Sequence, residues 1–430
     1  MRLIRLLVSG ATLAVAGTAL ARVPAIGGAA RKFPDARGKV MIFTDQLPDQ
    51  LTPAQRRFVA SHYVGTQKMT RNWALHIRRL NPNFIILHYQ LALGNDRADF
   101  VTGNRWTNDF ARVRKHKNWF LHTPAGRTIR QKVWRFRVAN ILFKNGAPVS
   151  GYPRYWIKSA VHRMRENLDD GVFADSYTQD ILMDQTVPRF PWFDNVRACE
   201  KYWLPQLNQF GAYVAAALHK KPEHFYYLPN LGGLVTSWDH TTNLAVGDGG
   251  MNEGFCINGP DSQLDHADWR LQMRRLLRLA RLKKIIICQS YLAAHKVNQR
   301  WFVAGAYLLI KGDTTYLNMF FKSSLEWYPQ YDVPLGRFSH GPRENVKKYW
   351  KPAWHVYRRR FANGMVLVNP GQHAAHIGPL TGRWFLAVAH GGGAVTAAGK
   401  APGHLTYRPV SAVTIPAYSA RVLLREVTDQ

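Results

Sequence analysis

Short apolar runs alternate with longer amphipathic stretches over the first three quarters of the chain. The runs are continuous and rich in Val, Ile, Phe or Tyr, as expected for strands that are buried on both faces. The longer stretches repeat apolar residues at helical spacing, most clearly at 53–63, where Thr52 is a candidate N-cap and Pro53 begins the helix, at 195–219 and at 267–283. The runs predict strands at Val40–Phe43, Phe84–Leu87, Trp119–Leu121, Gly171–Ala174, Phe225–Leu228, Leu244–Val246 leading into Met251, Ile285–Cys288 and Thr315–Phe320.

The alternation of strand and helix is typical of a parallel α/β sheet. Eight repeats over about 300 residues favour a closed (β/α)8 TIM barrel over an open, doubly wound sheet. We therefore predict an α/β fold with a barrel at 36–345. Beyond about residue 350, short strand-like runs with Gly- and Pro-rich turns replace the helical patterns. A C-terminal antiparallel β-sandwich domain is predicted at 353–430, with strands at Tyr357–Phe361, Met365–Asn369, Phe385–His390, Leu405–Pro409 and Arg421–Glu426.

The first 21 residues have the pattern of a secretory signal peptide. Arg2 and Arg5 precede an apolar run that extends from Leu6 to Leu20, and Ala19-Leu20-Ala21 matches an A-x-A cleavage site. The run holds about 15 residues, whereas a bilayer span needs roughly 20. We therefore expect a cleaved signal at 1–21 rather than a membrane anchor, and a secreted or periplasmic protein without a membrane span after cleavage.

The composition adds a strong positive charge. The chain has 58 Lys and Arg against 27 Asp and Glu, which gives a formal net charge of +31. A protein with this positive charge attracts anionic polymers, although life in an acidic medium explains the charge equally well. Helix-turn-helix, zinc-finger and RNP signatures are absent, so we predict no nucleic-acid ligand. Three cysteines, Cys199, Cys256 and Cys288, lack metal or disulfide spacing, which favours buried thiols, no metal site and no cofactor.

Polar side chains follow nearly every predicted strand. In a TIM barrel, the carboxyl ends of the strands build the active-site face. Amides and carboxylates there suit the hydroxyl groups of sugars, and aromatic rings suit their C–H faces. We therefore expect a monomeric protein whose partner is a polysaccharide, either anionic or containing amino sugars. The expected substrate-binding residues are Asp45, His88, Tyr89, Gln90, His122, Tyr177, Asn230, Asp248 and Gln289.

Two carboxylates are the best candidates for catalysis. Asp175 ends the apolar run in "DDGVFADSY", and Glu253 lies in the glycine-rich "AVGDGGMNEGF". Each has a non-catalytic alternative: Asp175 could be the N-cap of the following helix, and Glu253 could form an ion pair with an arginine. Asp248 is the main competitor for the second role. Glycoside hydrolysis requires one carboxyl group as general acid and another as nucleophile or base. Our hypothesis assigns the acid to Glu253 and the nucleophile or base to Asp175.

Four segments carry a family resemblance. "FIILHYQLALG", "WFLHTPAGRTIR", "GYPRYW" and "DGVFADSY" resemble the hypothetical glycoside hydrolase-like family 15, and the architecture is similar to that of endo-α-1,4-polygalactosaminidase barrels. The resemblance covers roughly residues 38–330. It implies that Asp175 and Glu253 are catalytic, and that His88, Tyr89, Gln90 and His122 face the substrate. It implies a glycosidase without naming its sugar. A non-catalytic polysaccharide-binding barrel and a cationic envelope- or nucleic-acid-binding protein remain the alternatives.

Overall fold

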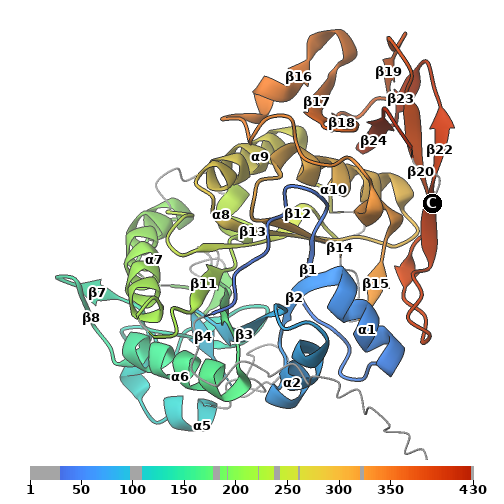
Figure 1. The fold of residues 1–430 in the computed structure, drawn as a ribbon. Helices are drawn as coiled ribbons and strands as arrows, with labels where there is room; N and C mark the ends of the chain where they lie inside the picture. The colour runs from blue at the N-terminus through green and yellow to red at the C-terminus, as the bar shows by residue number, and fades with distance from the viewer. Residues whose placement is uncertain are drawn as a thin grey trace, which may run out of the picture.

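The computed structural model describes residues 30–96, 109–177, 185–190, 192–220, 222–236, 243–259, 262–319 and 324–427, so the predicted signal peptide at 1–21 lies outside the described residues. Its centre is an eight-stranded parallel sheet (Figure 1). A parallel bridge between Asn230 and Met251 joins the two outer strands of this sheet, which closes it into the expected TIM barrel. In spatial order the strands are β11 (Tyr226–Pro229), β9 (Gly171–Asp175), β3 (Ile85–Leu91), β2 (Tyr63–Gln67), β1 (Ile42–Thr44), β14 (Thr315–Met319), β13 (Ile285–Tyr291) and β12 (Gly249–Asn258).

Helices surround the barrel, as Figure 1 shows. The predicted N-cap Thr52 forms a capping box with Gln55, and Asn195 and Asp265 cap two further helices with their side chains. These caps satisfy backbone N–H groups that have no partner inside the helix. The three clearest predicted helices are therefore confirmed. The helices are α1 (Pro53–His62), α2 (Arg71–Leu80), α5 (Phe110–Val113), α6 (Tyr152–Asn167), α7 (Val196–Leu218), α8 (Gly232–Thr236), α9 (His266–Arg281) and α10 (Val297–Ile310).

The N-terminal described segment seals the amino end of the barrel. The Phe33 ring packs against Tyr226 and Tyr316, with ring centroids 5.1 and 5.3 Å away, and the Tyr316 hydroxyl donates to the Pro34 carbonyl over 2.5 Å. Together with inward-facing strand residues they form one apolar cluster. The interior at this end is packed with side chains, so the chemistry is confined to the carboxyl end.

A buried ion pair fixes the amino end of β9. The Asp170 carboxylate accepts hydrogen bonds from Arg78 at 2.7 Å, Arg31 at 3.0 Å and the Ile86 N–H at 2.9 Å. Its neighbour Asp169 is also buried, and burial raises the pKa of its carboxyl well above the ordinary value. Burial thus favours the uncharged form of Asp169, which has nearly the shape of asparagine, so an asparagine substitution there is a matched control for the same substitution at Asp170.

Asp170→Asn is expected to lower the free energy of unfolding by about 3–5 kcal/mol, since it leaves a buried guanidinium without its counter-charge. Asp169→Asn is expected to change it by less than about 1 kcal/mol. Urea unfolding followed by tryptophan fluorescence measures both. Equal losses in the two variants would contradict this account of the amino end.

The predicted third strand is wrong. Residues 117–119 form a short 3-10 helix, and Phe120 and His122 form only isolated bridges. The barrel instead contains β2, which the sequence hides because Gly65 interrupts its apolar pattern. A Cβ at Gly65 would lie 2.6 Å from the Ile85 carbonyl oxygen, so neighbouring strands require a glycine there.

An excursion between β3 and α6 holds five short strands, and its strand β5 also pairs with β10 (Thr186–Val187). The five are β4 (Gly94–Asn95), β5 (Arg130–Gln131), β6 (Arg137–Val138), β7 (Phe143–Lys144) and β8 (Ala147–Pro148).

The sixth strand begins later than predicted. It starts at Gly249 rather than at Leu244, which moves Asp248 to the amino end of the barrel. A Cβ at Gly249 would lie 1.8 Å from the Ile285 carbonyl oxygen, so this glycine serves close strand packing rather than ligand approach. Gly254 has a φ of 76°, and the pairing with β13 shifts after Glu253. Glu253 is therefore the last regularly paired residue before a bulge.

The C-terminal part is the expected antiparallel β domain. A six-stranded sheet has one face against α10, where Gly305 allows close contact with Ala420, and the other against a two-stranded sheet. An apolar cluster that includes Leu367, Leu386, Ile377 and Ile415 fills the space between the two sheets. The larger sheet is β16 (Trp350–Lys351), β17 (Val356–Phe361), β18 (Gly364–Asn369), β24 (Ser419–Leu424), β20 (Phe385–Gly391) and β22 (Gly403–Pro409), and the smaller is β19 (Ala375–Ile377) with β23 (Val413–Ile415). A separate pair joins β15 (Glu326–Trp327) to β21 (Gly393–Ala394).

All three cysteines are buried, as predicted. Within the described residues, no helix has the length and apolar character that a membrane crossing requires.

Candidate active site

The inner surface of the barrel changes from apolar to polar along its axis. Side chains alternate between the two faces of a strand, so every second residue points inward. In β13, Ile285 and Ile287 belong to the apolar cluster, and Gln289 and Tyr291 continue the same face toward the carboxyl end. The same change occurs in the other strands. The polar layer consists of Asp45, Gln67, Tyr89, Asp175, Asn230, Glu253, Gln289, Tyr291 and Asn318.

Asp175 and Glu253 share one hydrogen-bond donor. The Asn230 amide nitrogen donates to Asp175 Oδ1 over 2.9 Å and to Glu253 Oε2 over 2.5 Å. The Asn230 amide oxygen accepts the Gly232 N–H over 3.0 Å, which fixes the orientation of the amide. Asp175 ends β9, Asn230 follows β11 and Glu253 lies in β12, so three adjacent strands build this unit.

Glu253 has surroundings that favour its protonated form. Burial raises the pKa of its carboxyl to about 7, and the negative charge of Asp175 adds to this effect. Hydrogen bonds from Tyr291 to Oε1 and from Asn230 to Oε2 oppose the rise. A carboxylic acid that keeps its proton near neutral pH is able to act as a general acid.

Asp175 has surroundings of a different kind. Its Oδ2 accepts the Tyr89 hydroxyl over 2.5 Å, and its Oδ1 accepts the Ser176 N–H over 2.7 Å as well as the Asn230 amide. Donors to both oxygens hold the plane of this carboxyl group in one orientation. Burial, followed by the charge of Asp175, raises the pKa of Tyr89 well above its ordinary value, so this hydroxyl stays a donor.

A chain of amides supports Glu253 from the other side. Asn318 donates to Gln289 Oε1 over 3.2 Å, and Gln289 donates to the Tyr291 hydroxyl over 2.7 Å. Tyr291 then donates to Glu253. Glu253 pairs in register with Gln289, and Gln289 with Asn318, which explains why the three side chains lie at one level.

A second acidic group lies across the barrel. Asp45 accepts hydrogen bonds from Gln67 and from Lys68, whose Nζ lies 3.1 Å from Asp45 Oδ2. The same Nζ lies 4.7 Å from the centre of the Tyr89 ring. Gln67 and Lys68 are site residues that the sequence did not reveal, because they belong to the unpredicted strand β2. The polar pair after "YVGT" was the only signal for them.

Several predicted substrate-binding residues lie elsewhere. His88 and Gln90 alternate with Tyr89 and therefore point outward, where Gln90 Nε2 donates to the Trp156 carbonyl in α6 over 3.4 Å. His88 is buried and bonded to Gln90, and burial lowers its pKa to about 4. We exclude both from the proposed site, because their side chains lie between the barrel and α6.

Three further predicted residues also lie away from the carboxylates. Tyr177 is buried, and its hydroxyl donates to the Leu207 carbonyl in α7 over 2.8 Å. Asp248 lies at the amino end of β12 and is bonded to His219 Nε2 over 2.8 Å. His122 lies in the excursion, with Nδ1 3.0 Å from the Phe120 carbonyl oxygen. The positions of Tyr177 and Asp248 do not support substrate contact, and His122 loses its predicted place at the end of a barrel strand.

A family model decides the classification. The model described as hypothetical glycosyl hydrolase family 15 matches residues 78–365, two thirds of the chain. The chain belongs to this family. The match begins in α2 and ends in β18, so it includes Asp175, Asn230 and Glu253. No curated protein matches the chain.

The solved structures that match this chain include a glycoside hydrolase domain, a dextranase and a pullulanase. The glycoside hydrolase domain of PelA from Pseudomonas aeruginosa is 10% identical, with a TM-score of 0.41, and the match covers 65% of this chain and 93% of that one. A Flavobacterium johnsoniae GH31 dextranase complexed with glucose is 10% identical, with a TM-score of 0.41 over 92% and 52% of the two chains. The pullulanase from Bacillus acidopullulyticus is 9% identical, with a TM-score of 0.40 over 92% and 61%.

The Asn230 amide that Asp175 and Glu253 share limits the distance between their carboxylate oxygens. Asp175 Oδ1 and Glu253 Oε2 are 2.9 and 2.5 Å from one nitrogen, so they lie at most the sum of these distances, about 5.4 Å, apart. Carboxyl groups about 5–5.5 Å apart are typical of retaining glycosidases, whereas inverting enzymes need roughly 6.5–9.5 Å for a water molecule. These two carboxylate oxygens are therefore closer to each other than the roughly 6.5–9.5 Å that separates the carboxyl groups of an inverting pair. Among the described residues, no group of three His, Cys, Asp or Glu side chains is arranged to hold a metal ion.

Proposed function

We propose that this protein is a retaining glycoside hydrolase that cleaves an extracellular or envelope polysaccharide, with Asp175 as nucleophile and Glu253 as general acid and base. The observation that carries the proposal is the shared Asn230 amide, which keeps Asp175 Oδ1 and Glu253 Oε2 within about 5.4 Å of each other. Membership of a glycosyl hydrolase family supports the reaction class. The exported location rests on the sequence pattern of residues 1–21.

The first step forms a glycosyl-enzyme ester. An Asp175 carboxylate oxygen attacks the anomeric carbon while the Glu253 carboxyl gives its proton to the glycosidic oxygen, and the bond between that oxygen and the anomeric carbon breaks. The Tyr89 and Asn230 donors hold the attacking carboxylate in position. The shortened polysaccharide leaves as an alcohol.

The second step releases the sugar. Glu253, now ionised, takes a proton from water, and the resulting oxygen attacks the anomeric carbon. The ester bond to Asp175 breaks, and its carboxylate is restored. Two inversions at one carbon give a product with the configuration of the substrate.

The raised pKa of Glu253 predicts an alkaline limit to activity. The first step requires a protonated Glu253, so kcat/KM is expected to fall as the pH rises through about 7. A pH profile measured under substrate-limiting conditions tests this expectation, with Glu253→Gln on an activated aryl glycoside as the control, because glutamine does not titrate. An alkaline limb near pH 7 that persists in the variant would assign that titration to another group.

The charge of the protein supports an acidic polymer as the substrate. A net charge of +31 favours encounter with acidic polymers. The protein is therefore tested against bacterial and plant polysaccharides between pH 4 and 7, with release of reducing ends as the readout. Release from at least one polymer is the expected result. Binding without release, equal in wild type and in Asp175→Asn, would replace the proposal by a non-catalytic polysaccharide-binding barrel.

A further inference from the structure

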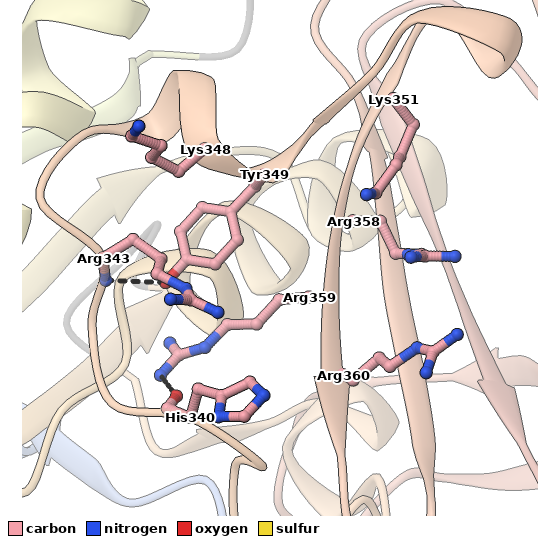
Figure 2. A pocket seen from close by; sticks show the side chains of 8 residues that line it. All are labelled: His340, Arg343, Lys348, Tyr349, Lys351, Arg358, Arg359 and Arg360. Carbon is pink, nitrogen blue, oxygen red and sulfur yellow. Dashed lines mark hydrogen bonds between the residues drawn. The ribbon is translucent and has the colours of Figure 1, made fainter.

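A strongly cationic pocket lies where the β domain meets the barrel (Figure 2). It has a volume of about 280 Å³, close to the lower limit of about 300 Å³ for small-molecule sites. Its wall comes from β17, from the end of β16 and from the segment before them. The eight lining residues are His340, Arg343, Lys348, Tyr349, Lys351, Arg358, Arg359 and Arg360.

The positive charges in this pocket are not neutralised by neighbouring carboxylates. The lining includes no Asp or Glu, and none of its six cations forms an ion pair with a carboxylate in the described part of the chain. The charge of Arg358 lowers the pKa of Lys351, with burial and Arg360 adding to the effect. Like charges therefore repel one another here, and an anion that enters the pocket relieves the repulsion.

Of the six cations, Arg359 has a structural role, and the other five remain available to bind a ligand. Arg359 is buried, and its guanidinium donates to the carbonyls of Leu308, Leu309 and Lys311 at 2.8–3.0 Å, at the end of α10. In Figure 2, Lys351, Arg358 and Arg360 lie one after another on the opposite side of the β17 ribbon from Arg359. This row follows from alternation along a strand.

The pocket and the catalytic pair lie at opposite ends of the barrel. Arg359 binds the C-terminal end of α10, and α10 leads directly into Thr315 at the amino end of β14. Asp175 and Glu253 belong to the carboxyl ends of their strands. A ligand in the pocket therefore does not occupy the position of the cleaved bond.

We propose that this pocket binds the oxyanion groups (carboxylate, sulfate or phosphate) of an acidic polysaccharide and so anchors the polymer away from the catalytic pair. Arginine recognises these groups because its planar guanidinium donates two parallel hydrogen bonds to a pair of oxygens. The row of cations, with Lys351 on β16 and Arg358 and Arg360 on β17, fits a chain with repeated charges better than a single ion. The choice of oxyanions rests on the pocket alone, and the choice of a polysaccharide as their carrier rests on the proposed function.

The test compares two charge-matched variants of the full chain, both with Asp175→Asn so that no polymer is cleaved. The pocket variant carries Lys351→Gln, Arg358→Gln and Arg360→Gln, which remove the row and leave the Arg359 contacts intact. The control variant removes three exposed cations from helices elsewhere, through Arg57→Gln, Arg79→Gln and Lys201→Gln. Fluorescence anisotropy at about 0.15 M salt, where diffuse attraction is screened beyond roughly 8 Å, measures binding of labelled polygalacturonate, dextran sulfate, duplex DNA and neutral dextran.

The pocket variant is expected to bind the two acidic polymers at least about 10-fold more weakly than its parent, and the control variant less than about 3-fold more weakly. Equal losses in both variants, or no binding of acidic polymers by the parent, would overturn the proposal. Two further results would do so as well: pocket-dependent calorimetric binding of inorganic phosphate or sulfate without polymer binding, and a loss confined to duplex DNA. Reducing-end release by the wild-type chain tests the glycosidase separately, so each of the two proposals can fail alone.

Discussion

Asp175→Asn is expected to lower kcat/KM on the natural polysaccharide by about four orders of magnitude or more. The amide keeps the shape of the side chain but cannot form the glycosyl ester, so the covalent route is lost. Initial rates of reducing-end release measure the loss. The matched control is Asp248→Asn, because Asp248 is also a hydrogen-bonded carboxylate of the barrel but lies at its amino end. We expect this control to keep activity within about 3-fold of wild type.

Rescue by azide separates the nucleophile from other roles. In Asp175→Ala, an azide ion is expected to attack the anomeric carbon from the space that the carboxylate leaves. A single displacement then yields a glycosyl azide of inverted configuration, whereas the wild-type product retains the configuration. An azide product of retained configuration would place Asp175 outside the nucleophile position.

Glu253→Gln is expected to lower activity about 10²–10⁴-fold on the natural linkage, because glutamine supplies no proton to the leaving oxygen. On an aryl glycoside with a good leaving group, formation of the ester is expected to slow by less than about 10-fold. Single-turnover kinetics on both substrates measure this difference. Equal losses on the two substrates would remove the acid role from Glu253.

The stability of Glu253→Gln gives a second test of the raised pKa of Glu253. A carboxyl whose pKa is about 7 in the folded chain, against an ordinary 4.5, binds its proton more tightly when folded, so it opposes folding once the pH exceeds 4.5. The opposition grows up to about pH 7 and amounts to at most about 3 kcal/mol. Glu253→Gln is therefore expected to be more stable than wild type at pH 8 and similar to it at pH 4. Urea unfolding at the two pH values measures the difference.

The sequence indicated the barrel because seven of its eight strands contain a predicted apolar run or, like β12, directly follow one. The exception, β2, is broken by Gly65, whose missing side chain makes room for the Ile85 backbone. The neighbouring strand requires a glycine at this position, and the pattern of apolar residues along the sequence does not show such a requirement. Gln67 and Lys68 were lost from the predicted site together with this strand.

The candidate site was predicted best where a strand ends in a polar residue that points inward. Asp175, Asn230, Glu253 and Gln289 meet this condition, and the structure brings them to one level of the barrel. The sequence could not tell which residues of "LHYQ" face inward, since that depends on the register of β3. It also could not locate the start of β12, so Asp248 was predicted at the wrong end of the barrel.

The most direct test of the central claim is mass spectrometry of a trapped glycosyl-enzyme. Glu253→Gln is mixed with a glycosyl fluoride of the sugar identified by the polysaccharide panel, because the fluoride leaves without acid assistance while hydrolysis of the ester stays slow. The account predicts a mass increase of one glycosyl unit, mapped to the peptide that contains Asp175 and absent when Asp175→Asn is added. An adduct on another residue, or turnover of the fluoride with an inverted product and no adduct, would contradict it.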